Sequence, residues 1–289
     1  RSFVSQPTLS VAIKKLEETL GLALFERNRG EALPTPAGAR IIAQAKKVLA
    51  EARLIEDLAR EGQDELAAPL RFGAIYTVAP YLLPGLVPAL KKIAPQMPLV
   101  IEENFTATLL AQLRETELDV IAIALPVHLE ALSAWPLYDE EFVVMLPAGH
   151  RWASDKQIAA KKLVEENLLL LGPGHCFREQ VVQACPHCLD ADADSPRPLT
   201  GSSLETIRHM VASGLGITVL PRSCADNRPR ESALLLTKPF APPAPRRQIG
   251  LLWRKSYPRL KAIEKLRAAI LVSGMKGVTY LPAAGIQSG

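Results

Sequence analysis

Three cysteines lie within thirteen residues of one another in this chain: Cys176, Cys185 and Cys188. A fourth, Cys224, stands apart from them. Cysteine thiolates attack electrophilic oxygen and sulfur and bind soft metals, so such a cluster favours redox or metal chemistry over a structural staple. An isolated cysteine is more often a small buried hydrophobe. The neighbours of each cysteine therefore have to decide between these interpretations.

Residues 185–188 form a C-x-x-C pair, a spacing found in zinc sites and in thioredoxin-type redox pairs. A closed zinc site needs four ligands. His175, His187 and Cys176 could complete one only if the fold assembled them, so we predict no metal. A thioredoxin-like pair occupies the first strand–helix turn of a small domain, whereas this pair is in mid-chain. Cys188 is then either an alternative reaction partner within the cluster or a bystander.

Cys176 follows a predicted strand and stands where the next helix should begin. Attack on an oxidant requires the thiolate, which nearby cations and a helix N-terminus favour. Arg178 and a second arginine, Arg246 or Arg247, are the candidate cations. Glu179 is either an acid of the first helical turn or a proton-transfer group, and the sequence leaves both roles open.

The composition bounds the class of protein. With 289 residues, 48% hydrophobic and 22% charged, the chain suits two or three globular domains. Its apolar runs are strand-sized, its first residues lack a signal-peptide core, and aromatic residues are only 5%. These features argue against a membrane protein and against a stacking platform for single-stranded nucleic acid. We expect a cytoplasmic protein without a cofactor.

The net charge of +4 is concentrated at one end. The first fifty residues contain eight Lys and Arg against four Glu, which accounts for the whole excess. A basic excess confined to one segment indicates an anionic partner there, with nucleic acid as the first candidate. Solvated helix faces look similar, so charge alone does not decide.

The elements change character near residue 69. Ser5 is a plausible N-cap for a helix to Leu20 that Gly21 ends, and Thr35 caps a second helix reaching about residue 61. A polar hairpin separates them. Beyond 69, strand and helix patterns alternate, which predicts α/β units with mostly parallel strands and a weakly ordered tail over 274–289. The predicted strands are 70–75, 99–103, 120–125, 142–146, 168–171, 217–220 and 249–253, and the predicted helices are 81–92, 109–115, 203–212 and 259–271.

The first segment carries three motifs in order: Val-Ser-Gln-Pro-Thr-Leu-Ser over 4–10, Leu-Phe-Glu-Arg over 24–27 and Leu-Pro-Thr-Pro-Ala-Gly over 33–38. They resemble the recognition helix, wing and linker-helix start of LysR-type transcriptional regulators. The resemblance implies a partial winged helix-turn-helix with a long linker helix over 1–61, bound to double-stranded promoter DNA. Two supporting helices would take roughly 25 further residues, so we expect the sequence to begin inside this domain. The predicted DNA contacts are Gln6, Pro7, Thr8, Ser10, Lys14, Arg27 and Arg29.

The remaining chain resembles the peroxide-sensing branch of the same family. The motifs are Gly-His-Cys-Phe-Arg-Glu-Gln over 174–180, Tyr-Thr-Val-Ala-Pro-Tyr-Leu-Leu-Pro over 76–84, Ser-Leu-Glu-Thr over 203–206, and the segments 214–221 and 246–250. The resemblance implies that Cys176 attacks hydrogen peroxide and Cys185 resolves the product as a disulfide, with Cys188 as an alternative. The residues expected to bind or activate peroxide are Thr77, Thr106, His175, Arg178, Glu179 and Arg247.

The resulting expectation is a periplasmic-binding-protein-like regulatory domain of two subdomains, 68–139 plus 246–273 and 140–245. We expect a homo-oligomer, a dimer of dimers, that engages RNA polymerase and acts as a regulator and not as an enzyme. Two other hypotheses stay open: a LysR-type regulator with a small organic effector, and a thiol-based peroxidase or oxidoreductase. A solute-binding module without a DNA role is less favoured because of the N-terminal motifs.

Overall fold

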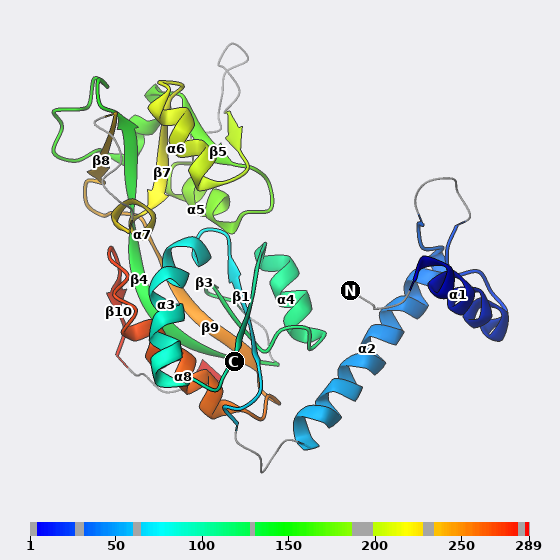
Figure 1. Cartoon of the computed structure of the whole chain (residues 1–289). Helices are drawn as coiled ribbons and strands as arrows, with labels where there is room; N and C mark the ends of the chain where they lie inside the picture. The colour runs from blue at the N-terminus through cyan, green and yellow to red at the C-terminus, as the bar shows by residue number, and fades with distance from the viewer. Residues whose placement is uncertain are drawn as a thin grey trace. The chain divides into compact units, whose positions relative to one another are not determined.

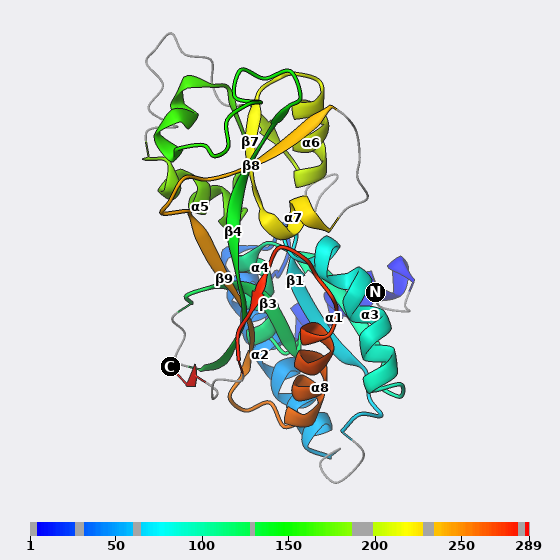
Figure 2. The same ribbon diagram turned by 90° about the vertical axis from the view of Figure 1, so that its left-hand side faces the viewer.

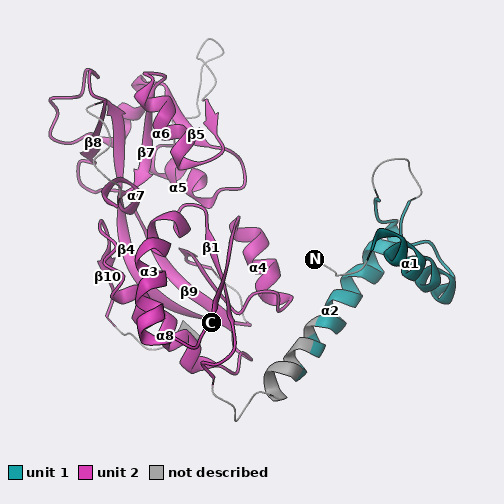
Figure 3. Cartoon of the chain, in the orientation of Figure 1, with its two compact units in different colours: residues 1–59 teal, residues 60–289 magenta. Residues whose placement is uncertain are grey.

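A computed structural model describes residues 5–26, 32–59, 65–127, 131–186, 199–227, 234–282 and 287–288. The chain divides into two compact units, residues 1–59 and 60–289 (Figure 3). Each unit is described by itself below.

The first unit contains two helices, α1 (Gln6–Leu20) and α2 (Pro36–Ala59). Ser5 caps α1, since its hydroxyl accepts a hydrogen bond from the Thr8 N–H at 3.4 Å. Gly21 ends α1 in the left-handed conformation (φ 69°) that glycine adopts at least cost. Both predicted helix boundaries of α1 are thus confirmed, because each depends on side chains within one turn.

The connection between α1 and α2 has the short antiparallel contact of a wing. Phe25 bridges to Pro34, and the Glu26 N–H donates to the Leu33 carbonyl at 2.8 Å. The Thr35 hydroxyl accepts from the Gly38 N–H at 2.9 Å, which confirms it as the cap of α2. The tip of this hairpin, over 27–31, lies outside the described residues.

The second unit begins with a parallel sheet. Its elements are β1 (Leu70–Ile75), α3 (Ala79–Ile93), β2 (Leu99–Asn104), α4 (Thr106–Arg114) and β3 (Val120–Leu125). The strand order is β2-β1-β3, with β1 parallel to both neighbours. The chain steps one way from β1 to β2 and the opposite way to β3. Right-handed crossovers therefore put α3 and α4 on opposite faces of the sheet (Figure 1).

Two long antiparallel strands join the halves of this unit (Figure 2). In β4 (Leu132–Pro147), residues up to Glu141 pair with β9 (Arg246–Arg254), and residues from Phe142 onward pair with other strands. This change of partner lies two residues beyond the predicted subdomain boundary at 140. The exact subdomain bounds stay a prediction.

The second half has its own parallel set, in the order β7-β5-β6, with β8 on the other side of β4. The expectation of mostly parallel strands was wrong: of the ten strand pairings in the described residues, six are antiparallel, and all six involve β4 or β9. The elements of this half are η1 (Ala160–Glu165), β5 (Leu168–Leu171), α5 (Cys176–Ala184), β6 (Thr200–Gly201), α6 (Leu204–Ala212), β7 (Ile217–Pro221), α7 (Arg222–Asp226) and β8 (Leu235–Pro239).

The C-terminal segment corrects one prediction. After α8 (Leu260–Leu271), which packs on α3, two short strands pair with β4: β10 (Thr279–Tyr280) and β11 (Gln287–Ser288). The prediction of a weakly ordered tail did not anticipate these strands, because an available edge of β4 supplies backbone partners that the tail's own sequence does not reveal. Among the described residues, no helix is both long and apolar enough to cross a membrane.

Candidate functional site

Cys176 lies in a small pocket where the two halves of the second unit meet. The pocket is built at the carboxyl ends of β1, β2 and β5, the edge at which open α/β sheets bind ligands. Its volume is about 10 Å³, close to the lower limit for one water molecule. The lining residues are Ile75, Tyr76, Thr77, Asn104, Phe105, Thr106, Gly174, His175 and Cys176.

The Cys176 thiol is free and half-buried. Cys176 is the first residue of the nine-residue helix α5, and His175 is its N-cap. The unpaired N–H groups of a first helical turn favour negative charge. The helix therefore places the sulfur beside these unpaired N–H groups.

Arg247 supplies the buried positive charge of the site. Burial by itself lowers the pKa of Arg247, but the negative charges of Glu140 and, next, of Cys176 raise it on balance. Its guanidinium is 2.7 Å from Glu140 Oε1 and donates to Thr77 Oγ1 at 2.9 Å. Glu140 is also held by the Ser223 hydroxyl at 2.5 Å. Arg247 thus stays charged, and it interacts electrostatically with Cys176.

His175 presents a shielded ring beside the thiol. It is 8% exposed, and desolvation lowers its pKa against an opposing backbone hydrogen bond with Ser202. The ring packs edge-on against Tyr76 and Phe105, with centroids 5.7 and 4.8 Å apart. Desolvation thus favours the neutral imidazole.

The two threonines predicted from the resemblance both line the pocket. Thr77 Oγ1 accepts its bond from Arg247, which leaves its own proton available to another acceptor. Thr106 Oγ1 is buried and has no hydrogen-bond partner among the described residues. A buried hydroxyl without a partner costs free energy that a small polar ligand would recover.

The other predicted activating residues lie elsewhere. The Arg178 guanidinium donates to the Leu171 carbonyl at 2.8 Å, so it secures the end of β5, and the cation that interacts with Cys176 is Arg247. Glu179 is exposed and is not among the residues that line the pocket.

The predicted bond between Cys176 and Cys185 is not present in this structure. Cys185 is buried and disulfide-bonded, but Cys176 and Cys224 are both free thiols, so neither of these is its partner. Cys188 and His187 lie outside the described residues. Among the described residues, no group of three His, Cys, Asp or Glu could hold a metal ion.

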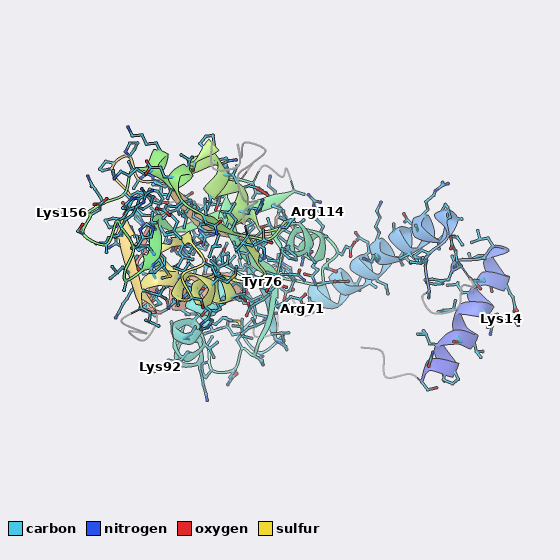
Figure 4. The ribbon with its side chains drawn as sticks, turned by 90° about the horizontal axis from the view of Figure 1, so that it is seen from above. Lys14, Arg71, Tyr76, Lys92, Arg114 and Lys156 are labelled. Carbon is cyan, nitrogen blue, oxygen red and sulfur yellow. The ribbon has the colours of Figure 1, made fainter. Side chains whose placement is uncertain are left out.

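Four residues of the site were missed from the sequence: Tyr76, Phe105, Glu140 and Ser223. Tyr76 and Phe105 are pocket walls, and Figure 4 labels Tyr76 on the second unit. Glu140 is paired with Arg247 by strand register, across 107 positions of sequence. Only the alternation of residues along β4 hinted that Glu140 points inward.

The predicted DNA contacts that are described lie on the exposed surface of α1 and near its N-terminus: Gln6, Pro7, Thr8, Ser10 and Lys14. Small polar groups at a helix N-terminus suit major-groove base edges, and Lys14 suits phosphates. Arg27 and Arg29 lie outside the described residues.

Each of the two units matches a known protein family. Residues 1–39 match the family described as bacterial regulatory helix-turn-helix protein, lysR family, and residues 63–272 match the LysR substrate binding domain. The chain belongs to the LysR family.

Within the LysR family the chain is similar to OxyR proteins. It is 40% identical to the Escherichia coli K12 DNA-binding transcriptional dual regulator OxyR, over 92% of this chain and 86% of that protein. A full-length OxyR variant from Pseudomonas aeruginosa has a similar structure, with 49% identity, a TM-score of 0.74, and 96% and 89% of the two chains covered. A hydrogen-peroxide-bound OxyR mutant from Corynebacterium glutamicum is 32% identical and superposes with a TM-score of 0.67. That match covers 93% of this chain and 84% of the other.

Proposed function

We propose that this LysR-family chain is a transcriptional regulator that senses hydrogen peroxide through Cys176. The observation that carries the proposal is the pocket, which has about the size of one water molecule. It holds a free thiol at a helix N-terminus, next to a buried hydroxyl that has no partner within the described part of the chain. The names of its OxyR relatives point to the same function.

The first step oxidises the sulfur. The Cys176 thiolate attacks one oxygen of hydrogen peroxide, the S–O bond forms as the O–O bond breaks, and the departing hydroxide takes up a proton to become water. The hydroxyls of Thr77 and Thr106 are placed to hydrogen-bond the peroxide oxygens. Arg247, the buried cation that interacts with Cys176, stays protonated throughout.

The second step makes a disulfide. A second thiol attacks the Cys176 sulfenic sulfur and releases the oxygen as water. Cys185 is the preferred resolving residue and Cys188 the alternative. Cys185 must first be reduced, since it is bonded elsewhere in the structure. We expect the protein to act in the cytoplasm as a homo-oligomer, a dimer of dimers. The new disulfide would change the spacing of its DNA-binding domains on promoter DNA, and this change would alter how the oligomer engages RNA polymerase.

The pocket's size favours this function over a small organic effector, which commonly needs several hundred Å³. A peroxidase would instead turn over many equivalents of peroxide with a thiol reductant.

The test is peptide mapping of fully reduced protein after one equivalent of hydrogen peroxide, for the wild type, Cys176→Ser and the control Cys224→Ser. We expect a disulfide at Cys176 in the wild type and control. A wild-type Cys176 that stays alkylatable would refute the proposal.

A further inference from the structure

Three aromatic rings enclose the pocket beside Cys176. Tyr76 follows β1, Phe105 precedes α4, and His175 precedes α5. The Tyr76 and Phe105 centroids are 5.3 Å apart, and each ring makes an edge contact with His175. We call Tyr76, Phe105 and His175 the aromatic wall. The rings come from both halves of the regulatory unit, so the wall lines the pocket from both sides.

The backbone fixes the position of Phe105. Its N–H donates to Asn104 Oδ1 at 2.9 Å. On the other side the ring lies against Gly174, where a Cβ would come within 3.3 Å of Phe105 Cδ1 and Cε1. Gly174 also has φ +93°, a conformation that side chains resist. Glycine therefore lets the phenyl ring lie directly over the residues that lead into Cys176.

The wall limits the free space in front of the thiol. Tyr76 is its outermost ring at 37% exposure, whereas His175 is 8% exposed. The remaining volume of about 10 Å³ accommodates two small oxygen atoms only with slight adjustment. A tert-butyl or cumyl group is far larger than this space, so its approach to the sulfur would bring it against the packed rings.

We infer that Tyr76 and Phe105 are specificity-determining residues that admit hydrogen peroxide to Cys176 and exclude organic hydroperoxides. The inference rests on the proposed peroxide-sensing function. The chemistry at sulfur is the same for both oxidants: the thiolate takes the terminal oxygen, the O–O bond breaks, and the leaving oxygen is protonated to water or to an alcohol. Discrimination therefore arises from access to the sulfur and not from a different reaction.

The test compares oxidants on the full reduced chain. Loss of alkylatable Cys176 is timed with hydrogen peroxide and with tert-butyl hydroperoxide, for the wild type, Phe105→Ala, Phe105→Leu and Tyr76→Ala. We expect the ratio of the tert-butyl hydroperoxide rate to the hydrogen peroxide rate to rise about tenfold in Phe105→Ala. Phe105→Leu, which keeps most of the bulk, should stay near the wild type. Tyr76→Ala, at a more exposed position, provides a second variant if Phe105→Ala does not fold.

The control Tyr280→Ala removes another ring in an edge contact, 6.1 Å from Tyr138 and outside the pocket lining. Its ratio should equal that of the wild type. If the ratio is unchanged in both alanine variants while the wild type reacts normally with hydrogen peroxide, the specificity role of the aromatic wall is refuted and the proposed function is not. Equal acceleration with both oxidants also overturns it. A wild type that does not react with hydrogen peroxide overturns the proposed function, and the wall with it.

Discussion

Helix α5 separates the two cysteines that the resemblance pairs. Cys176 is its first residue and Cys185 its C-cap, so nine residues at about 1.5 Å each put the Cα atoms about 13 Å apart. A disulfide needs Cα atoms within about 7 Å. We therefore predict that α5 must at least partly unwind after Cys176 is oxidised and before Cys185 can resolve it.

Glu179 offers a way to change the stability of α5 without touching the pocket. It is exposed on α5, and the matched pair Glu179→Gly and Glu179→Ala removes the same carboxylate. Glycine costs a helix interior about 1 kcal/mol relative to alanine, or about fivefold in the population of the unwound state. If unwinding precedes resolution, disulfide formation should be about fivefold faster in the glycine variant than in the alanine variant.

The assay starts from fully reduced protein and follows two events by quenched alkylation and peptide mapping: loss of the Cys176 thiol and appearance of its disulfide. The first should be equal in the two variants, because Glu179 does not line the pocket. Equal rates of disulfide appearance in the two variants would refute the unwinding step. A slower first event in both would instead give Glu179 a role in proton transfer.

Three further predictions concern buried groups of the same unit. Arg247→Met should lower the free energy of unfolding in urea by about 3–5 kcal/mol, because it leaves Glu140 buried without its partner. Adding Glu140→Gln to this variant should recover part of the lost stability. If the double variant recovers nothing, the pairing is contradicted. Burial raises the pKa of the Cys224 thiol to about 11, so native protein at pH 7 should keep Cys224 unalkylated under peroxide and iodoacetamide, and rapid labelling would count against this. Desolvation lowers the pKa of His175, so the folded state binds fewer protons than the unfolded state just below about pH 6.5. Stability should therefore fall as pH drops through that value, and fall less in His175→Asn; parallel pH profiles would exclude His175 as the cause.

Local signals in the sequence were sufficient for much of the fold. Ser5, Gly21 and Thr35 mark helix ends because capping depends on neighbours within one turn. The apolar runs at 120–125 and 168–171 match β3 and β5 because strands buried on both faces are continuously hydrophobic, and β1 follows the same pattern apart from Arg71. The first part of β4 was missed, since Pro136 interrupts it and polar residues fill its end near Glu141.

The surroundings of Cys176 were likewise visible in the sequence, because His175, the thiol and the start of α5 are adjacent along the chain. Thr77 and Thr106 were reached through resemblance, and the pocket brings both to the thiol. Only the tertiary structure decided which arginine interacts with Cys176. Arg178 is close in sequence but is held by Leu171, whereas Arg247 is distant and arrives through the pairing of β9 with β4.

The sequence alone therefore determined the family and the division into two units, and it singled out Cys176 as the candidate thiol, because all three depend on contiguous motifs. The tertiary structure decided the buried pairing of Arg247 with Glu140, the size of the pocket, and the contact of Phe105 with His175. These features depend on strand register and on packing between the ends of separate strands. Such contacts join residues tens to more than a hundred positions apart, and no local pattern of residue types specifies them.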